Sequence, residues 1–253
     1  MIKEADRAAT TDPKRPSAAG LPAKSDAPRM FDRIAPRYDL LNRLLSGRRD
    51  VAWRRQVAAL LPDRDRLEVL DIATGTADIL LTLFERRHNI ASGVGADMAG
   101  KMLAIGQDKI RAAGLNERIE LVQADALALP FADSSFDAVT IAFGIRNVTD
   151  VVRGLTEMNR VLRPGGRALI LEFSLPANAL IRWGYLLYFR HILPRLGALI
   201  SGDRGAYRYL NQTVEDFPYG TAFCDLMLTA GFADVTALPL TFGIASIYSG
   251  YRK

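Results

Sequence analysis

Short apolar runs alternate with longer amphipathic stretches along most of this chain of 253 residues. The apolar runs predict strands at residues 67–72, 90–95, 119–123, 138–142 and 167–173. Between them, apolar residues recur every three or four positions and predict helices at residues 79–87, 101–113 and 151–162. Strands and helices that alternate in this way form a mostly parallel sheet covered on both faces. The pattern therefore predicts an α/β fold with a doubly wound sheet.

The first part of the chain shows two patterns. Residues 1–28 are rich in Ala, Pro, Lys, Asp and Thr and carry almost no large apolar side chains. Such a stretch cannot bury enough surface to offset the entropy of ordering, so we expect a disordered tail. From residue 29 to 62 the spacing predicts a helical cap, whose second helix spans 51–61 and ends at Pro62. The apolar face of its first helix comprises Phe31, Ile34, Tyr38, Leu40, Leu41, Leu44 and Leu45.

The last part of the chain predicts a hairpin. Gly231 precedes two closely spaced apolar stretches, 235–240 and 244–251. Strands this close suit a hairpin, which adds an antiparallel element to the sheet. Upstream, the sequence Arg-Pro-Gly-Gly at 163–166 predicts a turn that ends a helix before the strand at 167. We expect residues 29–253 to form one domain around a seven-stranded sheet.

Residues 179–200 mix aromatic, apolar and basic side chains and contain a proline at position 194. Helices of this kind lie at membrane interfaces or cover apolar ligands. They also occur as core-packing helices with their arginines in solvent, and charge placement alone does not separate the two interpretations. We expect the surrounding insertion, residues 176–215, to form a lid or a membrane-facing region.

Composition narrows the classes of partner. A net charge of +5 and a pI near 9.5 favour a negatively charged partner, either a membrane surface or a nucleic acid. The arginines are scattered, however, and no basic stripe is interleaved with aromatic residues, so we expect no nucleic-acid groove. No apolar run approaches about 18 residues, and the N-terminal residues lack the apolar region typical of a secretory signal, so we expect neither a membrane span nor such a signal. We therefore expect a cytoplasmic protein, either soluble or peripheral on the inner face of the cytoplasmic membrane.

Residue types that bind metals are scarce. Cys224 is the single cysteine, and His88 and His191 are the two histidines. One cysteine excludes an internal disulfide and a thiol cluster, and it fits a reducing cytoplasm. Neither histidine lies in a motif, so we expect both to be surface or packing residues. The sequence therefore predicts no metal site.

The stretch 69–78, Val-Leu-Asp-Ile-Ala-Thr-Gly-Thr-Ala-Asp, carries the first functional signal. An apolar strand here ends in an acid and a turn of small residues before a new helix begins. In open α/β sheets a ligand lies beyond the carboxyl end of the strand, where small residues let backbone N–H groups approach it. Of the three glycines usual in a nucleotide-binding loop, Gly75 is present, and Ala73 and Ala77 stand at the other two places. An ordinary turn remains the alternative for this stretch taken alone.

Two further acids follow strands of the same predicted sheet. Asp97 comes about 20 residues after the loop, where such folds place an acid on ribose hydroxyls, and Asp125 follows the next strand. Together with Asp71, three acids are expected on one rim of the sheet. This negative charge is unfavourable for a pyrophosphate and favourable for a ligand with a sulfonium, an ammonium and an adenosine. The sequence therefore favours S-adenosylmethionine over NAD.

Five motifs carry a resemblance to a known family. They are FDRIAPRYDLLN at 31–42, FGIRNV at 143–148, RVLRPGG at 160–166, LEFS at 171–174 and YRYL at 207–210. Residues 31–253 resemble the ubiquinone/menaquinone biosynthesis C-methyltransferases, which act on the quinol ring of a polyprenylated lipid. RVLRPGG is widespread among class I methyltransferases, whereas FGIRNV followed by LEFS is much narrower. The resemblance implies the class I methyltransferase fold.

The resemblance also implies cofactor residues, position by position. Thr76 and Asp97 match the family's S-adenosylmethionine contacts, and Asp125 matches a position where a carboxylate could accept from the adenine amine. Some relatives have serine at the position of Ala142, so a contact there should come from the backbone. With the loop residues included, the expected cofactor set is Asp71, Gly75, Thr76, Asp97, Met98, Asp125, Ala126 and Ala142.

Methyl transfer from a sulfonium mainly requires that the acceptor carbon be held in line with the S–CH₃ bond. A quinol ring carbon beside a hydroxyl is electron-rich, whereas the oxidised quinone is not, so we expect the reduced ring to be the substrate. Because no histidine lies in the motifs, Arg146 is expected to stabilise a developing phenolate and Asn147 to fix the ring hydroxyl. A salt bridge that holds the loop is the alternative for Arg146. Residues expected to close over the site are Tyr38, the third catalytic candidate, Asp39 and, as weaker lid candidates, Tyr207 and Arg208.

Two other functions stay open. The same cofactor could serve methylation of a soluble phenol, sterol-like compound or amine, and residues 179–200 should then show no preference for membranes or prenyl chains. A non-catalytic module that binds lipids or nucleic acids on the same fold is the second alternative, favoured by the basic pI alone. The motifs do not separate benzoquinol from naphthoquinol acceptors. A homo-oligomer or an assembly of quinone-biosynthesis proteins is likewise left open.

Overall fold

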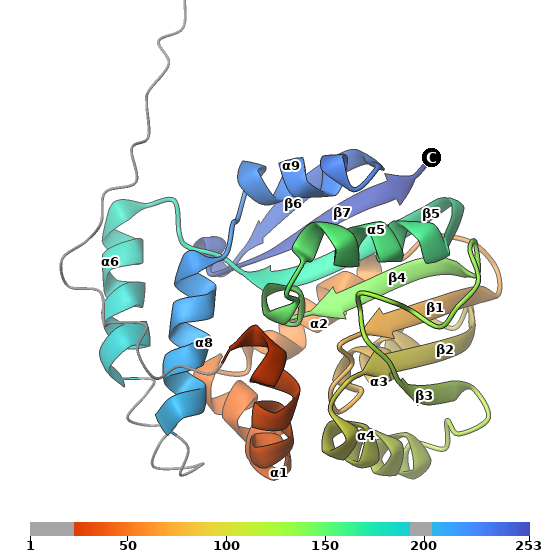
Figure 1. Ribbon diagram of the computed structural model, residues 1–253, viewed down its shortest axis with the longest axis horizontal. Helices are drawn as coiled ribbons and strands as arrows, with labels where there is room; N and C mark the ends of the chain where they lie inside the picture. The colour runs from red at the N-terminus through yellow and green to blue at the C-terminus, as the bar shows by residue number, and fades with distance from the viewer. Residues whose placement is uncertain (1–22, 193–203) are drawn as a thin grey trace, which may run out of the picture.

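The apolar runs predicted as strands lie side by side in a computed structural model, which describes residues 23–192 and 204–253. Seven strands form one sheet in the order β3-β2-β1-β4-β5-β7-β6 (Figure 1). Strand β7 is antiparallel to both of its neighbours, and the other pairings are parallel. The predicted α/β fold and its antiparallel element are therefore confirmed. The strands are β1 Leu67–Ile72, β2 Ile90–Asp97, β3 Ile119–Gln123, β4 Phe136–Ala142, β5 Leu162–Phe173, β6 Phe232–Leu240 and β7 Ala245–Arg252.

Successive residues of β1 enter two hydrophobic clusters, one on each face of the sheet. Val69 packs with residues of α2, α3 and α4, whereas Leu70 packs with residues of α5 and α9. Because side chains alternate between the two faces of a strand, a continuous apolar run buries both faces at once. The covering helices are α2 Arg49–Ala59, α3 Asp78–Arg86, α4 Gly100–Ala112, α5 Val151–Val161 and α9 Thr221–Thr229.

The carboxyl ends of the parallel strands meet at one rim, and the remaining helices gather beyond it (Figure 1). Open α/β sheets bind their ligands at this rim. The elements there are the short helices η1 Lys24–Asp26, η2 Ile145–Asn147 and η4 Thr241–Gly243, the long helices α1 Ala27–Leu45, α6 Ala179–Leu187 and α8 Arg204–Asp216, and the π-helical turn η3 Tyr188–Ile192.

The largest difference from the predicted bounds is at the start of β5, which was expected at residue 167. Strand β5 pairs with β4 at Leu162 and again from Arg167 onward, so residues 163–166 form a bulge within the strand instead of a turn before it. Pro164 has no N–H to donate to a ladder, and Gly165 has a φ of +71°. The chain therefore loops out for four residues and rejoins the same strand.

The regions around the cap also differ in detail. Residues 24–28, predicted to belong to the tail, lie in η1 and the first turn of α1, where Ala27 packs against Met30 and Tyr209. Residues 1–22 lie outside the described residues, so the predicted disorder of that part stays a prediction. The sequence pattern does not predict α8, which lies at the end of the predicted insertion, or α9, which lies between the insertion and the last two strands.

Helix α6 and η3 occupy most of the amphipathic segment, whose residues 193–200 lie outside the described part. Helix α6 contains no buried residue, and Leu180 and Trp183 are 76% and 66% exposed. The core-packing interpretation is therefore not supported for this helix. Within the described ranges, no helix combines the length and the apolar character needed to cross a membrane.

Candidate functional site

The loop between β1 and α3 turns at three residues with left-handed backbone. Ala73, Gly75 and Ala77 have φ angles of 49°, 56° and 64°. Glycine adopts this conformation without strain, whereas each alanine costs about 1 kcal/mol there. The Ala77 N–H donates to the Thr74 carbonyl at 2.9 Å, and the Thr74 N–H donates to the Ala96 carbonyl at 3.1 Å. The predicted turn thus forms with two alanines in a backbone conformation that favours glycine.

Asp71 lies one residue before the end of β1 and is almost fully buried. Its carboxylate accepts hydrogen bonds from the hydroxyls of Thr74 and Thr140, both at 2.6 Å. Burial raises the pKa of Asp71 to about 7, although the two hydrogen bonds oppose the shift. The side chain does not line the cavity at the rim. Asp71 therefore supports the loop from inside the sheet and adds little charge to the rim.

Asp97 and Asp125 both lie at the rim. The Asp97 carboxylate accepts from the N–H groups of Gly75 and Ala99, both at 2.8 Å. Burial raises the pKa of Asp97 above its ordinary value, against the effect of these backbone hydrogen bonds. The exposed Asp125 accepts from the Leu127 N–H at 2.9 Å. Because each carboxylate oxygen has two lone pairs, both acids retain acceptor capacity for a ligand.

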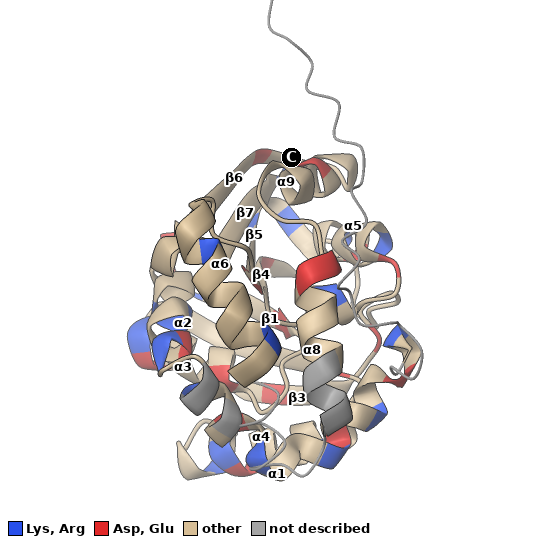
Figure 2. Ribbon diagram, turned by 90° about the vertical axis from the view of Figure 1, so that its left-hand side faces the viewer, with Lys and Arg blue, Asp and Glu red and all other residues tan. Residues whose placement is uncertain are grey.

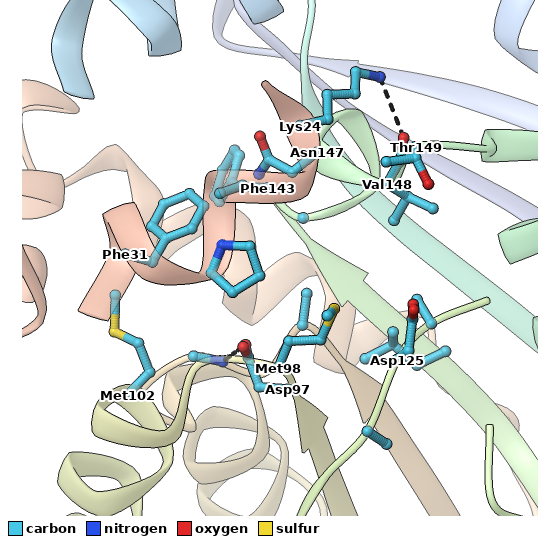
Figure 3. Close-up of a pocket in the computed structure, with 18 of the residues that line it drawn as sticks. Lys24, Phe31, Asp97, Met98, Met102, Asp125, Phe143, Asn147, Val148 and Thr149 are labelled. Atoms are coloured by element: carbon cyan, nitrogen blue, oxygen red, sulfur yellow. Dashed lines mark hydrogen bonds between the residues drawn. The ribbon is translucent and has the colours of Figure 1, made fainter. Parts of the chain in front are cut away.

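A cavity of about 300 Å³, here called the donor cavity, opens between these acids and helix α1 (Figure 3). Its size is at the lower end of the range for small-molecule sites. Asp97 and Asp125 line one side, and Asn147 lies across from Asp97 near Phe143 (Figure 3). The Asn147 Oδ1 atom is buried and has no partner within the described residues. The predicted site residues that line this cavity are Tyr38, Gly75, Asp97, Met98, Asp125, Ala126, Ala142 and Asn147.

The roof of the donor cavity comes from the N-terminal cap. Lys24 of η1 and Phe31 and Tyr38 of α1 line the cavity, and the Lys24 Nζ atom donates to the Val148 carbonyl at 3.2 Å (Figure 3). The expectation that Tyr38 approaches the site from the cap thus agrees with its position. A ligand in this cavity would be enclosed between the sheet rim and α1.

Thr76 does not line the donor cavity but joins the cap to the loop. Its hydroxyl donates to Asp39 at 2.7 Å and accepts from the Lys109 ammonium at 2.9 Å. Lys109 also pairs with Asp39 at 2.5 Å and with Asp78 at 2.6 Å. Burial would raise the pKa of Asp78, but the charges of Arg54 and Lys109 outweigh it and hold the pKa below its ordinary value. The cluster fixes α1 against α3 and α4 above the loop.

A second cavity of about 190 Å³, here called the acceptor cavity, lies beside the first. The two cavities share Phe31, Tyr38 and Phe143 as lining residues. Phe143 stacks at a tilt on Phe173, with 4.5 Å between ring centroids, and Trp53 packs against both rings. The acceptor cavity is therefore suited to a flat, apolar group. The shared side chains of Phe31, Tyr38 and Phe143 separate it from the donor cavity.

Arg146 is the charged group of the acceptor cavity that lies directly after β4. Its Nη1 atom donates to Glu172 at 2.8 Å and to the Phe143 carbonyl at 2.5 Å. Its guanidinium carbon lies 5.5 Å from the centre of the Phe173 ring. The Nε atom is buried and has no hydrogen-bond partner among the described residues. The salt bridge that was the alternative interpretation is therefore present, and the same side chain also lines the cavity.

Three tyrosines that were not predicted as site residues line the acceptor cavity, namely Tyr185, Tyr188 and Tyr209. Tyr185 lies on α6 and Tyr209 on α8, and both hydroxyls are buried without a hydrogen-bond partner in the part of the chain described. Burial raises the pKa of both phenols, and the nearby charge of Arg146 opposes the shift. Tyr209 belongs to the YRYL motif. The side chains of Tyr207 and Arg208, the two candidates taken from that motif, lie outside the described residues.

The arrangement favours transfer of a group between two ligands. A cationic donor suits the cavity lined by Asp97 and Asp125, and an aromatic acceptor suits the cavity that holds Arg146. The two ligands would meet at the shared aromatic side chains. Among residues 23–192 and 204–253, no cluster of three or more His, Cys, Asp or Glu side chains could hold a metal ion.

Residues 23–252 match the ubiE/COQ5 methyltransferase family. The chain is 52% identical over 223 residues to the demethylmenaquinone methyltransferase of Thermus thermophilus, which covers 88% of this chain and 100% of the relative. It is 47% identical to the ubiquinone/menaquinone biosynthesis C-methyltransferase UbiE of Geobacter sulfurreducens, over 88% of this chain and 87% of the relative. The similarity therefore extends over both cavities and the insertion.

Solved structures share the fold at lower identity. A SAM-dependent methyltransferase from Thermotoga maritima, described as a possible histamine N-methyltransferase, has a TM-score of 0.63 and 19% identity, covering 89% of this chain and 99% of that chain. The [4+2]-cyclase SpnF has a TM-score of 0.61 and 17% identity, covering 92% and 97%. Since a cyclase shares this architecture, the fold alone does not decide the reaction. The match of the family over residues 23–252 and the two close relatives do decide the family: this chain belongs to the ubiE/COQ5 methyltransferase family.

Proposed function

We propose that this protein transfers a methyl group from S-adenosylmethionine to a ring carbon of a polyprenylated quinol in ubiquinone or menaquinone biosynthesis. The observation that carries the proposal is the shared wall of Phe31, Tyr38 and Phe143 between a carboxylate-lined cavity and an aromatic cavity with a buried cation. The names of the Thermus and Geobacter relatives support the substrate class. Holding the two reactants on either side of one wall supplies the proximity that methyl transfer mainly requires.

When bound, S-adenosylmethionine supplies an electrophilic methyl group on a sulfonium. Asp97 accepts hydrogen bonds from the ribose hydroxyls, and Asp125 accepts from the adenine amine. Asn147 lines the donor cavity and not the acceptor cavity, so we assign its unpartnered Oδ1 atom to the ammonium of the donor instead of a ring hydroxyl. Asp71 and Thr76 act through the loop, because neither side chain lines the cavity.

Arg146 stabilises negative charge on the ring oxygen next to the attacked carbon. Glu172 holds the guanidinium through the 2.8 Å contact at Nη1, which leaves Nε without a protein partner. Tyr38, on the shared wall, has a pKa raised by burial, so it stays protonated at neutral pH. Tyr38 therefore donates a hydrogen bond to the acceptor and does not serve as the base.

The proposed acceptor carries a lipid chain, which suggests that α6 contacts a membrane as well as lining the acceptor cavity through Tyr185. Leu180, Trp183 and Leu187 are spaced along one face of α6 and are 76%, 66% and 46% exposed. Figure 2 shows that the ribbon of α6 is mostly free of charged residues. The net charge of +5 favours an anionic surface. We infer that this face of α6 rests on the cytoplasmic membrane while the acceptor cavity behind it receives the ring.

A methyl-transfer assay with labelled S-adenosylmethionine tests the proposed function. The acceptors are a short-chain demethylmenaquinol, a short-chain methoxylated benzoquinol, their oxidised quinones and a soluble simple phenol. We expect transfer to one or both quinols and none to the quinones. Equal transfer to the simple phenol would favour a soluble acceptor instead. Tight donor binding without transfer to any acceptor would favour the non-catalytic alternative.

A further inference from the structure

Three buried polar atoms that can donate hydrogen bonds belong to residues that line the acceptor cavity, and they have no partners in the described part of the chain. They are Arg146 Nε and the hydroxyl oxygens of Tyr185 and Tyr209. Buried donors without partners are uncommon in folded proteins, and such groups often belong to binding or catalytic sites. An apolar prenyl chain could not accept a hydrogen bond from any of them, whereas a ring oxygen could.

The three groups come from separate elements that converge on one place. Arg146 lies in η2, Tyr185 in α6 and Tyr209 in α8, and α8 contacts η2 directly. All three residues line the acceptor cavity, and the charge of Arg146 opposes the rise in the pKa of both phenols. Burial keeps both phenols protonated, so each retains an O–H to donate.

The number of donors distinguishes a neutral hydroxyl from an anion. A ring hydroxyl has two lone pairs, and its own hydrogen would compete with a third donor. A phenolate oxygen has three lone pairs and no hydrogen, so it can accept from all three groups at once. Donors that are already fixed in place stabilise developing negative charge strongly because they need no reorganisation.

We propose that Tyr185 and Tyr209, together with Arg146, form an oxyanion site that binds the acceptor ring oxygen in its ionised form, which makes both tyrosines catalytic residues. The proposal rests on the proposed function. The ring hydroxyl gives its proton to water, and an electron pair of the adjacent ring carbon then forms the bond to the methyl group as the S–CH₃ bond breaks. The sulfur leaves as a neutral thioether. The ring carbon finally gives its own proton to water, which restores the aromatic phenolate.

The test uses Tyr185→Phe and Tyr209→Phe, with Tyr251→Phe as the matched control. Tyr251 lies near the end of β7, at the opposite rim, where its ring contacts Arg167. We expect each cavity variant to lower kcat by roughly tenfold or more, with donor affinity unchanged. The rising limb of the pH profile of kcat should move to higher pH, because the bound phenolate is less stabilised. Both variants should melt no lower than the wild type, since only an unpartnered hydroxyl is removed.

An acceptor with an electron-withdrawing ring substituent sharpens the test. Its hydroxyl ionises more readily, so the loss in kcat caused by either phenylalanine should be several-fold smaller than with the natural quinol. Unchanged kcat and pH profile in both cavity variants would overturn the oxyanion site, as would an equal loss in Tyr251→Phe. If the wild-type protein methylates no quinol at all, the proposed function fails first, and the two failures are thereby distinguished.

Discussion

The guanidinium of Arg146 is buried, pairs with the Glu172 carboxylate and lines the acceptor cavity. Replacing the arginine alone would leave Glu172 buried without its partner, a change that typically costs 3–5 kcal/mol. The double variant Arg146→Met with Glu172→Gln removes both charges and should fold. We expect its kcat to fall by about 10²–10³, which is typical for loss of one group that stabilises an oxyanion. Steady-state kinetics with a quinol acceptor measures this.

Glu172→Gln alone is the control for that variant. Because Arg146 does not line the donor cavity, calorimetry should give donor dissociation constants within about twofold of the wild type for both proteins. Turnover in the double variant equal to that of the wild type would show that the arginine has a purely structural role.

Asp71 makes stability depend on pH. Its pKa of about 7 in the folded chain lies above the value near 3.9 of an unfolded chain. The protonated carboxyl thus contributes stability that is fully present below about pH 4 and is lost as the pH rises to about 7. Replacing it by asparagine removes this dependence. We expect the stability of Asp71→Asn relative to the wild type to increase by roughly 2 to 3 kcal/mol between about pH 5 and pH 8.

Urea unfolding of both proteins at the two pH values measures the difference. Thr140→Val is the matched control, because it removes one of the two hydroxyls that donate to Asp71 and leaves the carboxyl in place. A relative stability that stays constant across this range would mean that Asp71 is ionised throughout.

The sequence predicts the rim acids better than the groups of the acceptor cavity. Asp97 and Asp125 follow from strand ends alone, because parallel strands deliver their last residues to one edge. Asp71 pairs with Thr140 on the neighbouring strand and is covered by the loop. Its position near the end of a strand does not reveal this burial. Tyr185 and Tyr209 reach their cavity only through the packing of α6 and α8, and no local pattern encodes that packing.

At the scale of elements, β2 contains a glycine at which any larger residue would collide with neighbouring side chains. A Cβ at Gly95 would lie 2.5 Å from Leu121 Cδ2 and 2.9 Å from Thr74 Cγ2. We expect Gly95→Ala to destabilise the fold by about 1–3 kcal/mol and to weaken donor binding, because Thr74 belongs to the loop. Thermal unfolding checks this. Gly184→Ala on α6 is the control, since a Cβ there meets nothing within 4 Å, and a similar loss of stability in both would contradict the steric account.

Helix α6 is expected to bind membranes through its exposed apolar face. The double variant Leu180→Asp with Trp183→Asp should lower binding to vesicles of phosphatidylcholine and phosphatidylglycerol by at least about tenfold, because it places two charges on the face proposed to enter the interface. Cosedimentation measures the effect. Leu228→Asp on α9 is the control, because Leu228 is 52% exposed on a separate helix. Equal vesicle binding by all three proteins would contradict a docking role for α6.

Most elements on the sheet are predictable to within a few residues, with α9 as an exception, whereas α8, which packs on other helices, is not. Helix α5 follows from its own amphipathic period because one face lies on the sheet. Helix α8 packs on α1 and η3 through residues such as Tyr209 and Asn211, so its pattern depends on partners far away in the sequence. The bulge at 163–166 is missed as part of β5 because Pro-Gly-Gly indicates a turn in any context.

At the scale of the whole molecule, one rim of the sheet holds both cavities, and the N-terminal cap closes them together. Helix α1 contributes Phe31 and Tyr38 to the shared wall, and Asp39 of the same helix is clamped by Lys109. This geometry makes the two ligands neighbours and requires the acceptor ring to be the group at the wall. We therefore expect the methyl group to reach a ring carbon and not a ring oxygen.

Mass spectrometry with a trideuteromethyl donor distinguishes methylation at carbon from methylation at oxygen. The purified protein is incubated with trideuteromethyl S-adenosylmethionine and a reduced short-chain quinol, and the product is fragmented. We expect a ring fragment that retains three deuterium atoms bound to carbon when the quinol is supplied, and no such fragment when the oxidised quinone is supplied. A label that sits on a ring oxygen as a methyl ether, or equal labelling of the quinone, would contradict carbon methylation of the reduced ring.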